Sequence, residues 1–344
     1  MNAKILVTGG TGYIGSHTVV ELLMRGYQVV IADNLSNSYQ NVVDNIELIT
    51  GKRPFFEKIE LCDDGQVRQL FEKHKDITGV IHFAALKAVG ESVEKPLLYY
   101  RNNLFALINV IQCMLEHNCH CFVFSSSCTV YGQPDKLPVK EDSPVQQAIS
   151  PYGNTKQISE EIIKDKAVIA PLKASLLRYF NPIGAHESAI IGELPIGVPN
   201  NLVPFITQTA IGKREMLKVF GKDYSTPDGT CIRDYIHVVD LAKAHIISLE
   251  RMLHDKNKKP VEVFNLGTGR GNSVLEVINA FEEATGVKLN YTFASRRSGD
   301  VEQIWADTTY AQNELGWKAE KSLKQMVKTA WEWELHLHAK ESKQ

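Results

Sequence analysis

The chain has 344 residues, of which 44% are apolar and 23% are charged, and its formal net charge is −2. This composition is that of an ordinary globular protein, and the near-neutral charge without a long Lys/Arg block argues against nucleic acid or an anionic membrane surface as a partner. The sequence has no apolar run long enough for a membrane helix, and it enters a glycine loop before a signal-peptide core could form, so we expect a cytoplasmic protein.

The first predicted elements form a dinucleotide-binding unit. A buried strand over residues 4–8 runs into Gly9 and Gly12, and a helix is predicted over residues 13–25. The two glycines let the backbone turn and approach a pyrophosphate, and Gly15 lets the helix pack closely against the strand. The positive end of this helix would then face the phosphates.

A second strand, over residues 28–32, ends at Asp33. An acidic residue about 20 positions beyond the glycines is where a carboxylate accepts hydrogen bonds from an adenosine ribose. No Arg follows Asp33 directly, so a ribose 2′-phosphate would meet an unpaired carboxylate. The sequence therefore predicts NAD rather than NADP.

Strand-like runs continue to alternate with helical stretches, which predicts an α/β fold with a Rossmann-type, doubly wound parallel sheet. The further runs cover residues 54–60, 79–83, 121–125 and 174–179. The length predicts about two domains, and prolines and glycines become frequent from residue 181. We therefore expect an NAD-binding domain over 1–180 and a smaller C-terminal α/β substrate-binding lobe over 181–344, with segments near 238–266 returning to the first domain.

A Tyr-x-x-x-Lys pair, Tyr152 and Lys156, follows the fifth strand-like run. Ser150 can cap a helix there, which places the two side chains on one helical face. A Lys charge and a positively charged nicotinamide would both lower the pKa of the phenol and make Tyr152 a usable base. The hydroxyl of Ser127, at the end of a neighbouring strand, could hydrogen-bond the substrate oxygen. These groups favour alcohol oxidation.

A group of cysteines and histidines between residues 113 and 121 has the composition of a metal site but not its spacing. Cys121 begins an apolar strand, adjacent residues of a strand point to opposite faces, and no second ligand pair stands at zinc-finger spacing. We expect no metal site, and we expect the six cysteines to be reduced thiols.

Several segments together resemble the extended short-chain dehydrogenase/reductase family, and within it the UDP-hexose 4-epimerases. The segments are TGGTGYIG (8–15), ADNL (32–35), HFAALKAVGES (82–92), SSSCTVYG (125–132), LRYFNP (177–182), NNL (200–202) and RDYIH (233–237). The resemblance implies interconversion of UDP-galactose and UDP-glucose through a transient 4-keto sugar, with tightly bound NAD. It also implies a homodimer.

By that resemblance, Ser127, Tyr152 and Lys156 are catalytic. The implied NAD-binding residues are Gly9, Gly12, Tyr13, Ile14, Gly15, Asp33, Asn34, Asn37, Glu60, Leu61, Phe83, Ala84, Ala85, Lys87, Asn102, Ser125, Tyr152, Lys156 and Tyr179. The implied substrate-binding residues are Lys87, Ser127, Tyr152, Phe180, Asn181, Asn200, Asn201, Leu202, Val219, Phe220, Arg233, Arg297, Asp300 and Ile304. Phe220 stacks near the uracil or belongs to the core, and the sequence leaves both open.

Three alternatives accompany this interpretation. Ile304 occupies the family position that controls pocket size, and its intermediate volume leaves UDP-N-acetylhexosamine activity open. A nucleotide-sugar 4,6-dehydratase needs an Asp-Glu pair after the catalytic hydroxyl, whereas this chain has Cys128 and Thr129, neither of which can supply a carboxyl acid. A regulatory protein that only senses NAD is a third alternative, although such proteins usually lose the catalytic tyrosine or lysine, and both are present.

Overall fold

The computed structural model describes residues 3–297 and 300–342 of the chain. Its largest feature is a seven-stranded sheet with the strand order β10-β6-β5-β4-β1-β2-β3, in which every neighbouring pair is parallel. The strands are β1 (Lys4–Thr8), β2 (Gln28–Asp33), β3 (Phe55–Lys58), β4 (Ile77–His82), β5 (Cys121–Ser127), β6 (Lys173–Tyr179) and β10 (Val261–Leu266). The predicted fold class is thereby confirmed.

Helices cover both faces of this sheet. They are α1 (Tyr13–Met24), α2 (Asn41–Thr50), α3 (Asp64–Lys73), α4 (Val89–Glu94), α5 (Pro96–Glu116), α6 (Pro151–Ile169), α8 (Val238–Leu253) and α10 (Thr309–Leu315). Ile5 and Val7 of β1 share one apolar cluster with α1, α2 and α8, whereas Leu6 joins a second cluster with α3, α5 and α6. Because successive strand residues point to opposite faces, one short apolar run contributes to both layers of the core.

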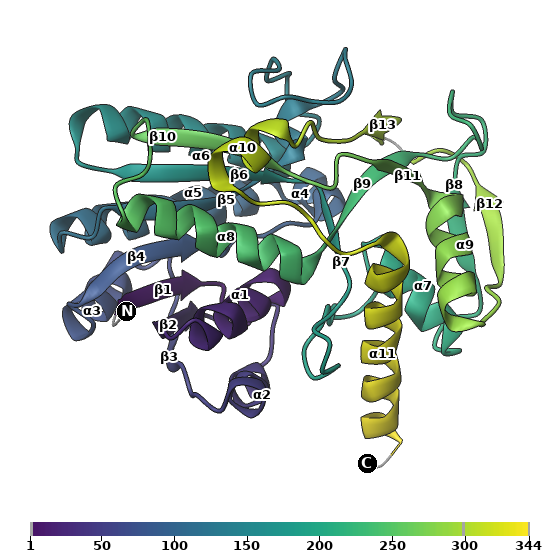
Figure 1. The fold of residues 1–344 in the computed structure, drawn as a ribbon, viewed down its shortest axis with the longest axis horizontal. Helices are drawn as coiled ribbons and strands as arrows, with labels where there is room; N and C mark the ends of the chain where they lie inside the picture. The colour runs from purple at the N-terminus through teal and green to yellow at the C-terminus, as the bar shows by residue number, and fades with distance from the viewer. Residues whose placement is uncertain (1–2, 298–299, 343–344) are drawn as a thin grey trace.

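A smaller lobe lies beside the sheet, at the right of Figure 1. It contains the strand order β11-β9-β13, with β7 paired to β9, and a separate pair of β12 with β8. Its strands are β7 (Asn181–Ile183), β8 (Leu217–Phe220), β9 (Ile232–His237), β11 (Gly271–Ser273), β12 (Tyr291–Ala294) and β13 (Gln303–Ile304). Its helices, α7 (Leu202–Ala210), α9 (Val274–Thr285) and α11 (Leu323–Glu341), enclose a third apolar cluster.

The chain crosses between these two parts more than once. After β9 it enters α8, which covers the large sheet, and β10 then pairs with β6 from Val261–Ala174 to Leu266–Tyr179. The segment predicted to return near residues 238–266 therefore lies on the large sheet. The division into two domains at residue 181 stays a prediction.

β1 has the predicted ends, and the other strands differ from theirs by one or two residues at one or both ends. β5 extends to Ser127 because Ser126 and Ser127 continue the parallel ladder opposite Arg178 and Tyr179 of β6. β3 is shorter than the predicted run over 54–60, and α1 ends at Met24. None of the described helices is long and apolar enough to cross a membrane.

Candidate active site

The glycine loop after β1 leaves a backbone cradle. Gly9 has φ +67°, and a Cβ there would lie 2.8 Å from the backbone nitrogen of Ala84. A Cβ on Gly15 would clash with the carbonyl oxygen of Gly9, so both glycines are needed for this close approach. Gly12 caps α1 without a side-chain hydrogen bond, which leaves the N–H groups of the first turn, at Tyr13 and Ile14, available to an anion. This cradle fits the pyrophosphate of a dinucleotide.

Asp33 lies buried at the carboxyl end of β2, beside this loop. Its carboxylate accepts hydrogen bonds from Thr11 N at 3.2 Å and Leu35 N at 2.9 Å, which fix its orientation. Next to it, the Asn34 side chain donates to Glu60 at 2.8 Å. The structure thus brings Asp33, Asn34 and Glu60 together at the sheet edge where dinucleotides bind in such folds, and their contact with adenosine stays a prediction.

Two other residues predicted at this end differ in exposure: Asn37 is exposed in the same loop, and Leu61 is buried.

The loop after β4 forms the next part of the site. The backbone nitrogen of Phe83 donates to Thr8 O at 3.1 Å, which holds the start of the loop, with Ala84 and Ala85, against the glycine cradle. Asn102, on α5, donates to Asn103, and Asn103 donates to Thr155 on α6 at 3.0 Å. These amides connect the predicted nicotinamide side to the helix that carries Tyr152 and Lys156.

The helix α6 begins as the sequence predicts. The hydroxyl of Ser150 caps it by accepting from Gly153 N at 3.1 Å, and Pro151 occupies the first turn. Tyr152 and Lys156 both lie on the buried face of the helix. The Lys156 ammonium donates to the carbonyl oxygen of Ser125 at 2.7 Å and lies 5.9 Å from the centroid of the Tyr152 ring.

The carboxyl end of β5 brings further hydroxyls to this helix. Ser127 is buried, its hydroxyl accepts from Thr129 N at 3.2 Å, and its side chain acts to lower the pKa of Tyr152. The hydroxyls of Ser125 and Tyr179 are 2.5 Å apart. Ser127, Tyr152 and Lys156 therefore converge at one point, as the sequence predicts for alcohol chemistry.

Burial dominates the electrostatics of the Tyr152–Lys156 pair. Burial raises the pKa of Tyr152 well above its usual value of 10, Tyr179 raises it further, and the hydrogen bond to Ser127 opposes the rise. Burial also lowers the pKa of Lys156 to about 8, against the effect of Glu160, which raises it. In the protein alone, burial of the phenol outweighs the other effects on its pKa, and the lowering of this pKa by Lys156 together with a bound nicotinamide stays a prediction.

The predicted substrate side is assembled from the smaller lobe. Phe180 and Ile304 are buried in one apolar cluster with Val130, beside Cys128. Ile304 of β13 pairs with Arg233 of β9, which carries Arg233 to the same place.

Charged side chains lie around this cluster. Nη2 of Arg233 is 3.8 Å from Oδ1 of Asp300. Asp234 instead accepts from Thr268 and from Ala306 N, so Arg233 and Asp234 do not pair with each other. Asn181, at the start of β7, pairs with Tyr235 of β9.

Phe220 is half-buried at the end of β8, and the Arg297 guanidinium lies 4.7 Å from its ring centroid, while neighbouring Val219 is buried in the core. The arginine therefore covers an aromatic face that could otherwise receive a base.

Asn200 and Asn201 are exposed just before Leu202, the first residue of α7. Asn201 donates to Oε1 of Glu193 at 2.6 Å, and the Lys87 ammonium lies 3.6 Å from the same oxygen. Glu193 was not singled out in the sequence, because no local motif marks a carboxylate whose partners are 106 and 8 residues away.

The chain matches known proteins over nearly its whole length. A family model described as GDP-mannose 4,6 dehydratase matches residues 6–330. UDP-glucose 4-epimerase 1 of Oryza sativa subsp. japonica is 50% identical over 333 residues, which cover 96% of this chain and 94% of the relative. UDP-glucose 4-epimerase of Haemophilus influenzae is 49% identical, with 96% and 97% covered. The chain belongs to the UDP-glucose 4-epimerase family.

Solved structures of UDP-glucose 4-epimerases share the fold. The enzyme from Stenotrophomonas maltophila, solved with bound NAD and formylated UDP-arabinopyranose, is 45% identical with a TM-score of 0.95, over 98% of this chain and 100% of that one. The enzyme from Bifidobacterium longum, solved with NAD+ and UDP, is also 45% identical, with a TM-score of 0.93 over 97% and 98% of the two chains. The dehydratase name of the family model does not describe this epimerase, since Cys128 and Thr129 follow Ser127.

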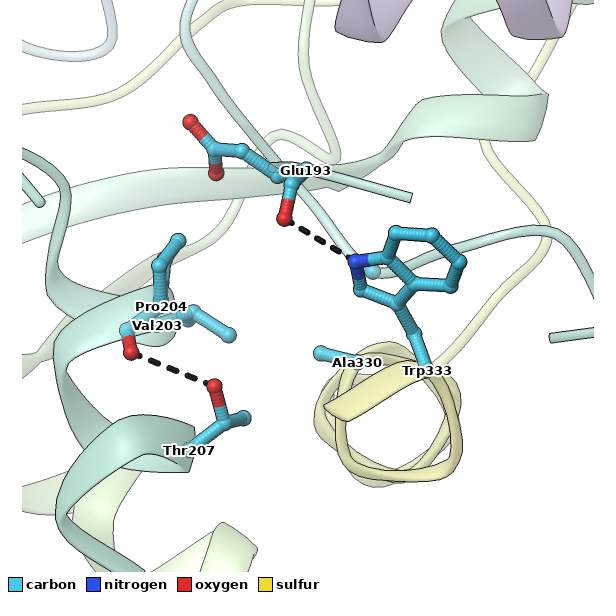
Figure 2. Close-up of a pocket in the computed structure, with 7 residues that line it drawn as sticks. Glu193, Val203, Pro204, Thr207, Ala330 and Trp333 are labelled. Atoms are coloured by element: carbon cyan, nitrogen blue, oxygen red, sulfur yellow. Dashed lines mark hydrogen bonds between the residues drawn. The ribbon is translucent and has the colours of Figure 1, made fainter. Parts of the chain in front are cut away.

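Cavities also lie away from the catalytic residues of this epimerase. The first, about 10 Å³, has room for about one water molecule and lies between α7 and α11. Figure 2 shows Trp333 at its wall, donating through Nε1 to the carbonyl oxygen of Glu193 at 3.0 Å. Trp333 thereby fixes the backbone of Glu193, whose carboxylate contacts Lys87 and Asn201.

The second cavity, about 340 Å³, includes Thr78, Cys121 and Lys173 and lies at the opposite, amino edge of the large sheet. Across residues 3–297 and 300–342, no group of three or more His, Cys, Asp or Glu side chains could hold a metal ion.

Proposed function

We propose that this chain is an active UDP-glucose 4-epimerase, which interconverts UDP-galactose and UDP-glucose with NAD as a resident cofactor. The observation that carries the proposal is the convergence of Ser127, Tyr152 and Lys156 at the carboxyl end of β5, next to the glycine cradle. In parallel α/β sheets ligands bind at this edge. The relatives at about 50% identity are UDP-glucose 4-epimerases, which favours the unacetylated hexoses over the N-acetylated ones.

The cofactor would lie along this edge. The first turn of α1 would receive the pyrophosphate, and the carboxylate of Asp33 would accept from the adenosine ribose. When bound, NAD supplies a hydride acceptor and donor for C4 of the sugar and a positive charge close to the phenol. Lys156 would hold the nicotinamide ribose, and Lys87 and Asn102 would complete that side of the site.

Proton transfer at the sugar is assigned to two hydroxyls. The phenolic oxygen of Tyr152 would take the proton from the 4-hydroxyl and later return it. The Ser127 hydroxyl would orient the 4-oxygen and stabilise the charge that develops on it. Burial raises the pKa of Tyr152, so proton uptake depends on positive charge near the phenol, part of which Lys156 provides.

The nucleotide would remain fixed while the 4-keto sugar turns over. Arg233 and Arg297 suit this role, because a guanidinium pairs with phosphate oxygens in two places at once. Asp300 would meet the uridine ribose, and Phe220 would lie near the uracil. The turned sugar would present the other face of C4 to the site, so that its reduction there would invert one carbon without net redox change.

The deciding experiment is incubation of the purified protein with UDP-galactose and no added cofactor. UDP-glucose should form, and denaturation of the same sample should release about one NAD per chain. Binding of UDP-galactose without turnover would favour the regulatory alternative instead.

We also propose a homodimer in the cytoplasm. Support for the dimer comes from large apolar side chains exposed on α5, where Leu97, Phe105 and Ile108 are 81%, 50% and 41% exposed. A row of exposed apolar residues on one long helix favours burial against a second copy. Light scattering should give twice the chain mass, and Phe105→Asp should reduce it to the monomer, whereas a monomeric wild type would contradict the proposal.

A further inference from the structure

A buried ion pair lies one helical turn beyond Lys156. Glu160 on α6 and Arg178 on β6 are each 2% exposed. The guanidinium donates to both carboxylate oxygens, from Nε at 2.8 Å and from Nη2 at 2.6 Å. The hydroxyl of Ser126 on β5 donates to the same carboxylate at 2.7 Å. Glu160 therefore ties the catalytic helix to both neighbouring strands.

Each of the three consecutive serines of β5 lies near a different residue of α6. The carbonyl oxygen of Ser125 accepts from Lys156, the hydroxyl of Ser126 donates to Glu160, and the side chain of Ser127 acts on the pKa of Tyr152. Residues 152, 156 and 160 are spaced by four, which places them on one helical face. We propose, building on the function assigned above, that Glu160 is a positioning residue. It anchors α6 to β5 and β6, so that Lys156 stays against the carbonyl of Ser125 and keeps its charge for proton transfer at Tyr152.

The charges around Lys156 support this role. Its ammonium is buried among Ser125 O, the Phe124 ring at 4.8 Å and the Tyr152 ring, and a buried ammonium without a counter-charge loses its proton readily. On β4, burial lowers the pKa of His82 to about 3, so that imidazole is neutral and offers no charge.

Glu160, on the same helix, opposes the loss of this proton. Its carboxylate raises the pKa of Lys156, against burial, which lowers that pKa to about 8. Arg178 in turn keeps Glu160 ionised: burial raises the pKa of Glu160, but the bond to Arg178 and its charge leave that pKa below the usual value.

The test is Glu160→Gln, which keeps the shape of the side chain and removes its charge. In the variant, the alkaline fall of kcat should begin about one pH unit lower than in the wild type. The matched control is Lys164→Gln, which removes the exposed ammonium 3.4 Å from the same carboxylate and should leave the profile in place. A uniform drop in kcat with an unmoved alkaline limb would overturn the inference, because it would indicate lost packing alone.

A second readout does not depend on turnover. NMR titration of lysines labelled at Cε, with Lys156 assigned through Lys156→Arg, should show its pKa near 8 in the wild type and lower in Glu160→Gln. If the Gln variant does not fold, a wild-type Lys156 that titrates like an ordinary lysine still overturns the inference. If the wild type fails to convert UDP-galactose, the proposed function fails, and this titration still decides the role of Glu160.

Discussion

A single oxygen distinguishes Tyr152 from phenylalanine, and the proposed chemistry depends on it. Tyr152→Phe should reduce turnover of UDP-galactose by roughly 10²- to 10⁴-fold, the usual contribution of a positioned general base. The amount of NAD released per chain should stay the same, because the ring remains. The matched control is Tyr27→Phe, which also removes a buried phenol hydroxyl, here one that donates to Glu250 far from the site. A variant with near wild-type turnover would contradict the role of Tyr152 as base.

Side-chain volume at residue 304 should set which sugars are accepted. Ile304 is 4% exposed in the cluster that also contains Phe180 and borders Cys128. A larger side chain at this position must therefore extend into the space that the sugar would occupy. Ile304→Tyr should lower the ratio of UDP-N-acetylhexosamine to UDP-galactose turnover, and Ile304→Ala should raise it. The ratio is measured by competition of the two substrates in one reaction. An unchanged ratio in both variants would show that residue 304 does not control the pocket.

The start of α6 connects helix stability to catalysis. Removal of the cap in Ser150→Ala should cost about 1 kcal/mol of unfolding free energy. It should also lower kcat, because Tyr152 lies in the first turn that the cap orders. The matched control is Ser322→Ala, which removes a cap of the same kind from α11. Denaturant unfolding should give similar losses for the two variants, while only Ser150→Ala lowers kcat. An equal effect on kcat in both would contradict a local role for this cap.

Elements with strong local signals could be predicted from the sequence. β1 has the predicted bounds, and α1 begins at the predicted residue, because an apolar run that ends in glycines and a following helical apolar pattern are both strong local signals. β11 and β13 could not be predicted, since they have three and two residues and depend on pairing with β9.

The same distinction holds for the site. Motifs identified Tyr152, Lys156 and Asp33, whereas the pairing of Glu160 with Arg178 depends on the packing of α6 against β6. The sequence did offer one signal, the spacing of four between Lys156 and Glu160. The raised pKa of Tyr152 could not be predicted, because burial is a property of the whole fold.

At the scale of the whole molecule, buried histidines lie where the helices of the large sheet contact the smaller lobe: His17 is on α1 and His237 ends β9. The Tyr13 hydroxyl donates to the Gly184 carbonyl at 2.6 Å, and the rings of His17 and His186 lie 6.4 Å apart. Burial lowers the pKa of His17 to about 3 and that of His237 to about 4. These side chains are therefore neutral in the folded protein at pH values where they would be charged in the unfolded chain.

The stability of the protein should consequently fall as the solution is acidified. Below pH 6.5 the unfolded state binds protons at these histidines and the folded state does not, so the free energy of unfolding decreases with falling pH until the folded pKa values near 4 and 3 are reached. His82 and His245, with pKa values lowered by burial to about 3 and about 4, act in the same direction. Each such histidine contributes up to about 1.4 kcal/mol per pH unit. Three carboxyls whose pKa values are raised by burial, the half-buried Glu21 and Glu141 and the buried Asp234, oppose the trend.

The contribution of a single histidine, His17, to this pH dependence can be measured separately. His17 has an unpaired, buried Nε2, while its Nδ1 lies 2.7 Å from the carbonyl oxygen of Tyr13, so Gln can replace it and still donate to that carbonyl. Between pH 6 and pH 5, His17→Gln should show a slope of unfolding free energy against pH that is smaller by about 1 kcal/mol per pH unit. Urea unfolding at closely spaced pH values measures the slope. His338→Gln, at an exposed position on α11, is the control and should keep the wild-type slope. Equal slopes in the His17 variant and the wild type would mean that the imidazole is protonated in the folded protein, and the junction would then contain a buried charge.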